Sequence, residues 1–429
     1  MLALTLILLA ASSLFAQSII PNNPGVKPTI AIRNATIVPV SSAPIANGTI
    51  VFSNGVITAI GANVEVPANA TVIDARGSFV YPGMIDSGSS VGLIEIDSVP
   101  GTVDTSELGD FNPNAQAAVA INPHSELIPV TRVNGVTHVV STPSGGIVSG
   151  QSALIQLAGW TPPQMVVKAG AAMNIFFPRL RSAPLADVPQ EEEAEKERTK
   201  SYTKQIDRLR DLFRDAQSYA KAASARTARF DRDLILEALV PVVEGHMPVV
   251  MHADQARDIR AALAFGDEFH LRVIVAGAQD AARVVSELKS RNVPVLLGPI
   301  LDLPQREDDA YDAVYSNASV LFQNGIRFAI QTQDAHNTRN LPYQAATAAA
   351  FGLPKEEALR AITLYPAQIW AVADRLGSLE VGKEASLIVT DGDPLEFRTN
   401  IQRVFIAGEE ISTDSRHTLL YKKFGNRPK

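Results

Sequence analysis

Short apolar runs recur eight times through the middle of the chain, and this repetition limits the possible folds more than any other feature. The runs lie at about 82–87, 135–142, 152–158, 165–169, 247–253, 271–277, 293–298 and 326–332. Several are almost continuously apolar, as expected for parallel strands buried on both faces. Helix-like segments, such as 254–265 and 278–290, follow some of them. The pattern predicts an α/β fold with a (β/α)8 barrel at 82–375, and an open doubly wound sheet is the alternative.

The two ends of the chain have a different sequence pattern, in which apolar and polar residues alternate between turn signals. In the segment 28–81, the sequence Ser53-Asn54-Gly55 separates two apolar runs and indicates a hairpin, because Asn and Gly tolerate positive φ. The same alternation returns at 376–412. Neither end is long enough to bury a core alone, so we expect both to form one composite β-sandwich domain.

A charged segment at about 188–230 interrupts the barrel pattern. Within it Ile206, Leu209, Phe213 and Ala216 fall at helical spacing. We expect a long amphipathic helix inserted in the barrel. Packing over the outside of the barrel is the plainer interpretation, and a lid or a partner-binding arm is the alternative.

The first 16 residues form an apolar run that ends in small residues at Ala16. The run is too short to span a bilayer and is typical of a signal peptide, although it lacks the usual Lys or Arg. The chain contains no cysteine, so it has no disulfide. We therefore expect a protein exported to the periplasm or secreted.

Charge and composition restrict the partners. With 429 residues, 46% of them hydrophobic, the chain can bury a large core and suggests two domains. A net charge of −7 without a basic block argues against nucleic acid. We expect a small-molecule substrate or ligand and no membrane span in the mature protein, and a homo-oligomer is an alternative to a monomer.

Two stretches resemble the amidohydrolase superfamily, and in particular its imidazolonepropionase-like members. They are FVYPGMID at 79–86 and the block NLPYQAATAAAFGLPKEEALRAITLYPAQIWAVADRLGSLEVGKEASLIVTDGDPLE at 340–396. The resemblance covers nearly all of the mature chain. It implies a barrel whose site lies at the carboxyl ends of the strands, where a divalent metal activates water for the hydrolysis of amide-like bonds.

The chain departs from that family at the positions of the metal ligands. Gly88 and Ser90 stand where the first strand normally carries His-x-His, and Ala276 stands at the ligand position of the sixth strand. Only His252 matches, at the fifth strand. We therefore predict a degenerate metal site to which no metal ligand is assigned, holding at most a single divalent ion such as zinc.

The end of the eighth strand leaves two alternatives open. Direct alignment with the family places Gln333 on the catalytic aspartate, with Asp334 one residue later. Adjacent residues of a strand face opposite sides, so Asp334 reaches the mouth only if the strand ends or bulges before it. We predict His252 and Asp334 as catalytic residues, and Gln333, His336 and Arg339 as substrate-binding residues.

Other candidates carry less weight. Lys168 is a possible counterpart of a lysine that bridges two metals in some relatives. The remaining histidines, of which His138 and His124 are the nearest to a barrel strand or loop, are expected to be structural. The polar segments 99–126 and 142–151 follow expected strands and should lie on the active-site face.

Two functions from different classes follow. The first is a hydrolase acting on non-peptide C–N bonds in amides, cyclic amides or dipeptide-like compounds, with a degenerate metal site. The second is a catalytically inactive, metal-free protein of the same fold that binds a small molecule.

Overall fold

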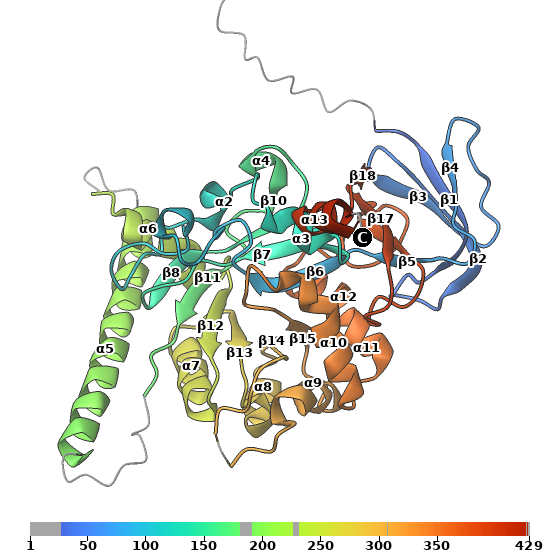
Figure 1. Cartoon of the computed structure of the whole chain (residues 1–429). Helices are drawn as coiled ribbons and strands as arrows, with labels where there is room; N and C mark the ends of the chain where they lie inside the picture. Colours follow the sequence, from blue (N-terminus) through green and yellow to red (C-terminus); the bar gives the residue numbers. More distant parts are fainter. Residues whose placement is uncertain (1–26, 181–190, 226–230, 307, 426, 428–429) are drawn as a thin grey trace, which may run out of the picture.

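A computed structural model describes residues 27–180, 191–225, 231–306, 308–425 and 427. The signal peptide expected at 1–16 lies outside these residues. The described strands form three sheets, and helices cover the outer side of the central ones (Figure 1). No described helix combines the length and the apolar character needed to cross a bilayer.

The first sheet has eight strands and draws on both ends of the chain. Its strands are β1 (Ile30–Ile37), β2 (Ile45–Ser53), β3 (Val56–Gly61), β4 (Thr71–Asp74), β5 (Phe79–Pro82), β16 (Leu387–Thr390), β17 (Ile401–Ile406) and β18 (Glu409–Ile411). The two ends meet where β5 pairs antiparallel with β16, with Val80 opposite Val389.

This sheet curls around its own apolar core. The rings of Phe52 on β2 and Phe405 on β17 meet edge to face at 5.3 Å between centroids, although β16, β5 and β1 separate the two strands in the sheet. Edge-to-face contact is a favoured arrangement of aromatic pairs. Ile32, Ile57 and Leu387 belong to the same buried cluster.

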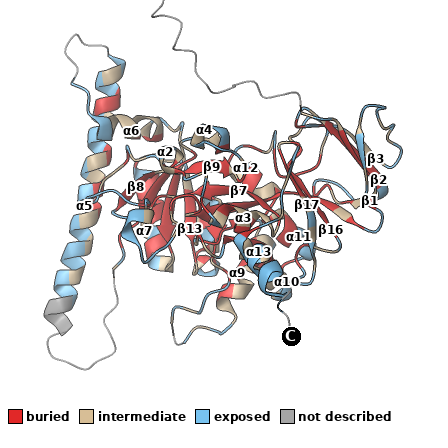
Figure 2. Ribbon diagram, turned by 45° about the horizontal axis from the view of Figure 1, so that its top comes forward, coloured by how far each residue is buried: buried red, intermediate tan, exposed pale blue. Residues whose placement is uncertain are grey.

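Two further sheets form the centre of the molecule. The four-stranded sheet contains β6 (Met84–Ser89), β7 (Val136–Ser141), β9 (Ala153–Gln156) and β10 (Val166–Lys168). The six-stranded sheet contains β8 (Val148–Gln151), β11 (Met173–Phe176), β12 (Val249–Ala253), β13 (Val273–Gly277), β14 (Val295–Leu297) and β15 (Phe328–Ile330). Figure 2 shows that buried residues are concentrated in these strands.

The strand pairing corrects the expectation of eight parallel barrel strands. The pairs from β11 to β15 are parallel, as is β6–β7, but β9 is antiparallel to β7. The run at 165–169 forms β10, an edge strand antiparallel to β9, and β11 lies beside β12 instead. Apolar runs of this length do not reveal strand direction, and Asn174 interrupts the apolar character of β11. Among the described strands, the ladder does not close into a ring.

The two central sheets nevertheless share one core and touch at their edges. Ile85 of β6 and Val140 of β7 belong to the same buried cluster as Val250 of β12. At the edge between β6 and β15, the backbone N–H of Gln333 donates to Gly88 O at 2.9 Å. The hydroxyl of Thr332 also donates to the carboxylate of Asp86 across this edge, which we call the seam between β6 and β15.

Helices cover the outer faces. They are α2 (Ala117–Ala120), α3 (Leu127–Arg132), α4 (Pro162–Met165), α6 (Leu234–Val243), α7 (Ala256–Glu268), α8 (Val285–Ser290), α9 (Ala313–Gln323), α10 (Leu341–Ala350), α11 (Lys355–Arg360), α12 (Leu364–Ile369) and α13 (Arg416–Gly425). Figure 1 shows α7 to α11 along the outer side of the sheet from β12 to β15. Asp233 caps α6 by accepting from two backbone N–H groups, which satisfies donors at the start of the helix.

The charged insertion contains one long helix, α5 (Glu191–Ser224). Leu209, Phe213 and Ala216 are fully buried, and Phe213 contacts Phe265 of α7 edge to face at 5.2 Å. The other side of the helix is exposed along most of its described length (Figure 2). The apolar spacing therefore marks the face that packs against the neighbouring helices α6 and α7.

Gly298, directly after β14, packs closely against the backbone of Gln331, so a substitution there tests this contact. Its φ is +139°, and a Cβ there would lie 2.1 Å from the backbone oxygen of Gln331. We expect Gly298→Ala to lower the free energy of unfolding by roughly 1–3 kcal/mol, from overpacking and backbone strain. Gly101→Ala is the matched control, because nothing lies within 4 Å of its Cβ position. Equal denaturant midpoints for the two variants would contradict this.

Candidate active site

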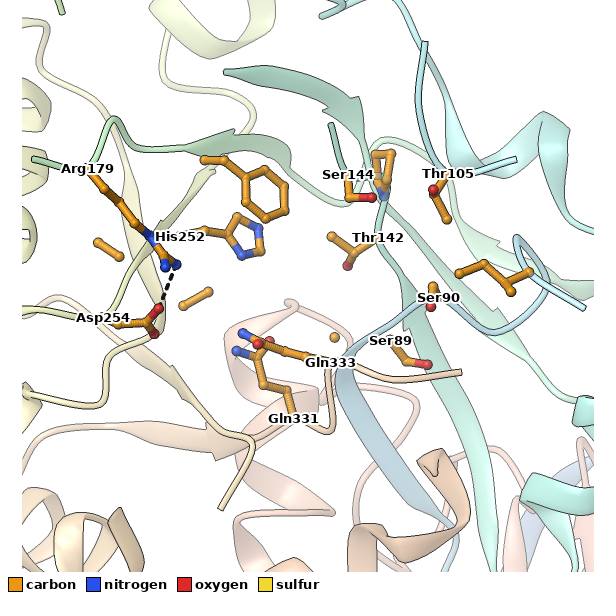
Figure 3. A pocket seen from close by; sticks show the side chains of 16 residues that line it. Ser89, Ser90, Thr105, Thr142, Ser144, Arg179, His252, Asp254, Gln331 and Gln333 are labelled. Carbon is orange, nitrogen blue, oxygen red and sulfur yellow. Dashed lines mark hydrogen bonds and ion pairs between the residues drawn. The ribbon is translucent and has the colours of Figure 1, made fainter. Parts of the chain in front are cut away.

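A cavity of about 300 Å³ opens at the carboxyl ends of β6, β12, β13 and β15. Its polar lining is mostly neutral and comprises the hydroxyls of Ser89, Ser90, Thr105, Thr142 and Ser144, the amides of Gln331 and Gln333, and the imidazole of His252. Arg179 and Asp254 are its charged residues among those described. Figure 3 shows these groups arranged around one space.

His252 lies near the end of β12, where a hydrogen bond and a stacking contact fix the orientation of its ring. Its Nε2 is 3.2 Å from Asn174 Oδ1, and the ring stacks on Phe176 at 4.1 Å between centroids. Burial, together with the positive charge of Arg179, lowers the pKa of His252 to about 3. The imidazole is therefore neutral at physiological pH and weakly basic.

Asp254 follows His252 by two residues and also lines the cavity. Arg179 Nη2 donates to Asp254 Oδ2 at 2.6 Å (Figure 3). Burial raises the pKa of this carboxyl, whereas Arg179 lowers it and three neighbouring aspartates raise it further. The other oxygen, Oδ1, lies over Gly277, at 2.2 Å from where a Cβ would stand. A glycine is thus required for this carboxylate to occupy its place.

The first-strand position that relatives use for a histidine is blocked in this chain. A Cβ at Gly88 would lie 2.3 Å from Gln331 Oε1, so the glutamine side chain occupies the space that a larger residue would need. Gln331 is held there because its Nε2 donates to Leu296 O at 2.9 Å. Ala276 at the end of β13 supplies no donor atom.

The donor set consequently does not suit the metal centre of the amidohydrolase superfamily. Such a centre needs three protein ligands of imidazole, carboxylate or thiolate type around an open position. In the described part of the chain, no group of three or more His, Cys, Asp or Glu residues is placed to hold a metal ion. At the cavity, glycine, serine, alanine and glutamine stand where ligands would be needed, so no step of the chemistry below uses a metal.

The five residues predicted from the sequence divide into two groups. His252 and Gln333 line the cavity, whereas Asp334, His336 and Arg339 do not. Asp334 Oδ1 accepts from the backbone N–H of His336 at 2.7 Å, and its Oδ2 accepts from Asn337 Nδ2 at 2.8 Å. The carboxylate thus orders the loop before α10, and we do not retain Asp334 as the general base.

The other two residues of that loop are also engaged away from the cavity. His336 Nδ1 lies 3.5 Å from Asp97 Oδ2, and Arg339 Nη1 donates to His336 O at 2.7 Å. Their position gives no support for contact with a substrate in this cavity. The backbone explains the division, because Gln333 has a φ of +55°, which turns the chain after β15 and directs Asp334 to the loop before α10.

Two polar loops expected at the active-site face each contribute to the lining. Thr105 comes from the loop after β6, and Thr142, Pro143 and Ser144 come from the segment after β7. The loops bind each other, since Ser144 N donates to Thr105 O at 2.8 Å. A backbone hydrogen bond therefore joins the two segments at the edge of the cavity.

The remaining candidates are structural in this arrangement. Lys168 Nζ donates to the backbone oxygen of Trp370 at 2.9 Å, and burial lowers its pKa. His138 is buried on β7, with Nδ1 2.9 Å from Thr137 Oγ1. Neither residue lines the cavity.

Sequence reasoning missed Asn174, Arg179, Asp254 and Gln331. A signal existed for Asp254, an acidic residue just beyond the end of a buried strand. No comparable signal marked Asn174 or Arg179, because β11 was not recognised as a strand. Gln331 adjoins a recognised strand, but its hydrogen bond to β14 depends on the tertiary structure.

We expect the protein to lose stability in acid, because two of its histidines are buried with lowered pKa values. The ordinary histidine pKa is 6.5, and burial lowers the pKa of His138 to about 4 and that of His252 to about 3. The unfolded chain therefore binds protons first as pH falls below 6.5, which favours unfolding. Asp86 opposes this, because burial raises its pKa to about 7. Asp254 acts in the same direction as Asp86, because burial raises its pKa too. The downward pKa shifts of the two histidines together exceed the upward shift of Asp86, so we expect the free energy of unfolding to fall between about pH 6.5 and 4.

Urea titrations at several pH values would measure this dependence. His138→Gln should reduce it, whereas His246→Gln, at an exposed histidine, should not. An unfolding free energy that rises steadily over the same interval would contradict the prediction.

Comparison with known proteins agrees with the resemblance seen in the sequence. The model of the amidohydrolase family matches residues 134–411. A curated relative, amidohydrolase tasK of Hapsidospora irregularis, is 24% identical over 435 residues, and the match covers 90% of this chain but 43% of that protein. The chain thus spans less than half the length of this relative.

Solved structures show the same fold. An amidohydrolase from Thermotoga maritima MSB8 superposes with a TM-score of 0.79 at 27% identity, covering 89% of this chain and 99% of that one. Phenylurea hydrolase B superposes with a TM-score of 0.54 at 16% identity, covering 90% of this chain and 97% of that one. The second likeness concerns the fold alone.

Proposed function

The chain belongs to the amidohydrolase family, and on that premise we propose that it hydrolyses a C–N bond of small, neutral amide or urea compounds bound in this cavity. The proposal assigns the activation of water to Asp254. The volume of about 300 Å³ and the mostly neutral hydrogen-bonding lining support a small uncharged substrate.

The position and pKa of Asp254 carry the proposal. Among the described residues that line the cavity it is the one carboxylate, and burial raises its pKa above the ordinary value of 3.8. A general base is more effective when its pKa approaches the working pH. His252, whose pKa is lowered to about 3, is a much poorer base.

The proposed reaction needs only water, the substrate and side chains of the protein. Asp254 Oδ1 accepts a proton from water as the water oxygen bonds to the substrate carbonyl carbon. The resulting oxyanion requires hydrogen-bond donors, and the cavity is lined by the amide of Gln333, the guanidinium of Arg179 and the hydroxyls of three residues, Ser90, Thr105 and Ser144. Asp254 then returns the proton to the leaving nitrogen as the C–N bond breaks, which gives a carboxylic or carbamic acid and an amine.

A second candidate is a binding protein without turnover. It is favoured by the ion pair between Arg179 and Asp254, since a guanidinium 2.6 Å away stabilises the carboxylate and weakens it as a base. Both candidates use the same cavity and differ only in whether bound ligand is cleaved.

Incubation of the purified protein with a panel of amides separates the two candidates. The panel comprises benzamide, phenylurea, N-acyl amino acids and cyclic imides, with release of ammonia or amine, or ring opening of the imides, measured before and after chelator treatment. We expect slow release that survives chelation. Binding without release would favour the second candidate, and release abolished by chelation and restored by zinc would refute activation of water by Asp254.

Three finer points belong to the same proposal. The two central sheets are proposed to correspond to the barrel of the family, with the seam between β6 and β15 in place of a closed ladder. Export through the segment 1–16 and assembly into a homo-oligomer remain proposals. Intact mass and size-exclusion measurements on periplasmic material test them.

A further inference from the structure

Asn174 has one orientation because a backbone carbonyl determines it. The side chain is 1% exposed, and Nδ2 donates to Gly150 O at 3.1 Å. A carbonyl oxygen can only accept, so the amide nitrogen must face Gly150. The amide oxygen, Oδ1, therefore faces His252.

This orientation determines which nitrogen of His252 carries the proton. Asn174 Oδ1 can only accept, so the ring nitrogen 3.2 Å away, Nε2, must donate. A neutral imidazole carries one proton, and the low pKa keeps the ring neutral. Nδ1 is therefore unprotonated and can only accept. Nδ1 makes no hydrogen bond to the described residues, and it is not fully buried. It is therefore open to the cavity that His252 lines.

Gln331 presents a second acceptor by the same logic. Its Nε2 donates to Leu296 O at 2.9 Å, which fixes the nitrogen toward β14. Its Oε1 is left beside Gly88, on the cavity side. No donor in the described part of the chain bonds Oε1, and this atom is not sealed from solvent either.

Gln333 complements these two acceptors. Its amide makes no hydrogen bond to the described residues and lines the same cavity, near Gln331 (Figure 3). It can donate to a ligand oxygen. The cavity thus offers two obligate acceptors and one adaptable amide, an arrangement complementary to a carbonyl with an N–H beside it.

We propose that the cavity selects primary and secondary amides or ureas, which carry an N–H, and discriminates against tertiary amides. The inference rests on the proposed function for the identity of the reacting group, and on the two acceptors for the selectivity. A tertiary amide would displace water from Nδ1 of His252 and Oε1 of Gln331 without returning a hydrogen bond to either. Leaving buried acceptors unpaired costs affinity.

The tautomer can be tested on the free protein without any ligand. Long-range ¹H–¹⁵N correlation spectra, assigned with a His252→Gln variant, should show His252 protonated at Nε2 and bare at Nδ1 between about pH 5 and 8. This measurement does not depend on catalysis. A proton on Nδ1 would overturn the inference.

Selectivity is tested with a matched pair of probes, benzamide and N,N-dimethylbenzamide, titrated by calorimetry or by the ¹⁵N shifts of His252. We expect the dimethyl compound to bind at least roughly tenfold more weakly. Gln331→Met removes one acceptor at similar length and should reduce that ratio. Gln368→Met, at an exposed glutamine of α12, should leave it unchanged.

The outcomes separate this inference from the proposed hydrolysis. Selective binding of benzamide, with no cleavage of it or of any other compound of the panel, would refute hydrolysis and leave the selectivity standing. Equal affinity for the two probes, or binding of neither, would overturn the selectivity whether or not another compound is cleaved.

Discussion

Replacing Asp254 with Asn is expected to lower kcat for amide hydrolysis by about 10²–10⁴-fold, the range typical of losing a general base. Asparagine keeps an oxygen near Arg179 but cannot accept a proton from water. The substitution should leave the denaturant midpoint nearly unchanged. Initial rates and urea titrations on the same preparation would separate lost chemistry from lost structure.

Asp302 provides the matched control. It is an exposed carboxylate that accepts from Gln279 Nε2 at 3.0 Å and does not line the cavity. Its charge nevertheless contributes to raising the pKa of Asp254. Asp302→Asn should therefore keep kcat and move the acid limb of the pH–rate profile to lower pH. Full activity of Asp254→Asn would contradict its assignment as the base.

The second large effect concerns Asp86, the last residue of the FVYPGMID stretch. Its carboxylate is completely buried at the seam between β6 and β15. Oδ2 accepts from Thr332 Oγ1 at 2.5 Å, and Oδ1 accepts from the backbone N–H groups of Gly88 and Thr332 at 3.0 and 3.2 Å. We expect Asp86→Ala to lower the free energy of unfolding by about 3–5 kcal/mol, because it leaves a cavity and buried donors without partners.

Asp86→Asn gives a sharper comparison than a distant control. Both backbone donors bind the same oxygen, so asparagine can keep them through Oδ1 and donate to Thr332 Oγ1 through its nitrogen. We expect a loss of about 1 kcal/mol or less for this variant. Glu65→Ala, at an exposed carboxylate without a hydrogen bond or ion pair to the described residues, should change stability by less than about 0.5 kcal/mol. Equal midpoints for the Ala and Asn variants would show that these bonds do not hold the seam.

Much of the fold and two of the five predicted site residues were accessible from the sequence. The FVYPGMID stretch and the block at 340–396 indicated the family, and local period and turn chemistry indicated the strands at both ends. His252 and Gln333 were predicted from the resemblance to the amidohydrolase family, which matches His252 to the fifth strand and aligns Gln333 with the catalytic aspartate after the eighth.

Only the tertiary structure decided which side chains share the cavity and in what chemical state. The direction of β9, β10 and β11 depends on pairing with distant strands, so apolar runs could not reveal it. Asp334 lies away from the cavity because the backbone turns at Gln333, whose φ is +55°, and because the Asp334 carboxylate accepts hydrogen bonds from the loop that follows. The proton on His252 follows from Asn174 and Gly150, which are distant from it in the sequence. Burial and hydrogen bonding set the protonation states, and both arise from contacts that the order of residues does not display.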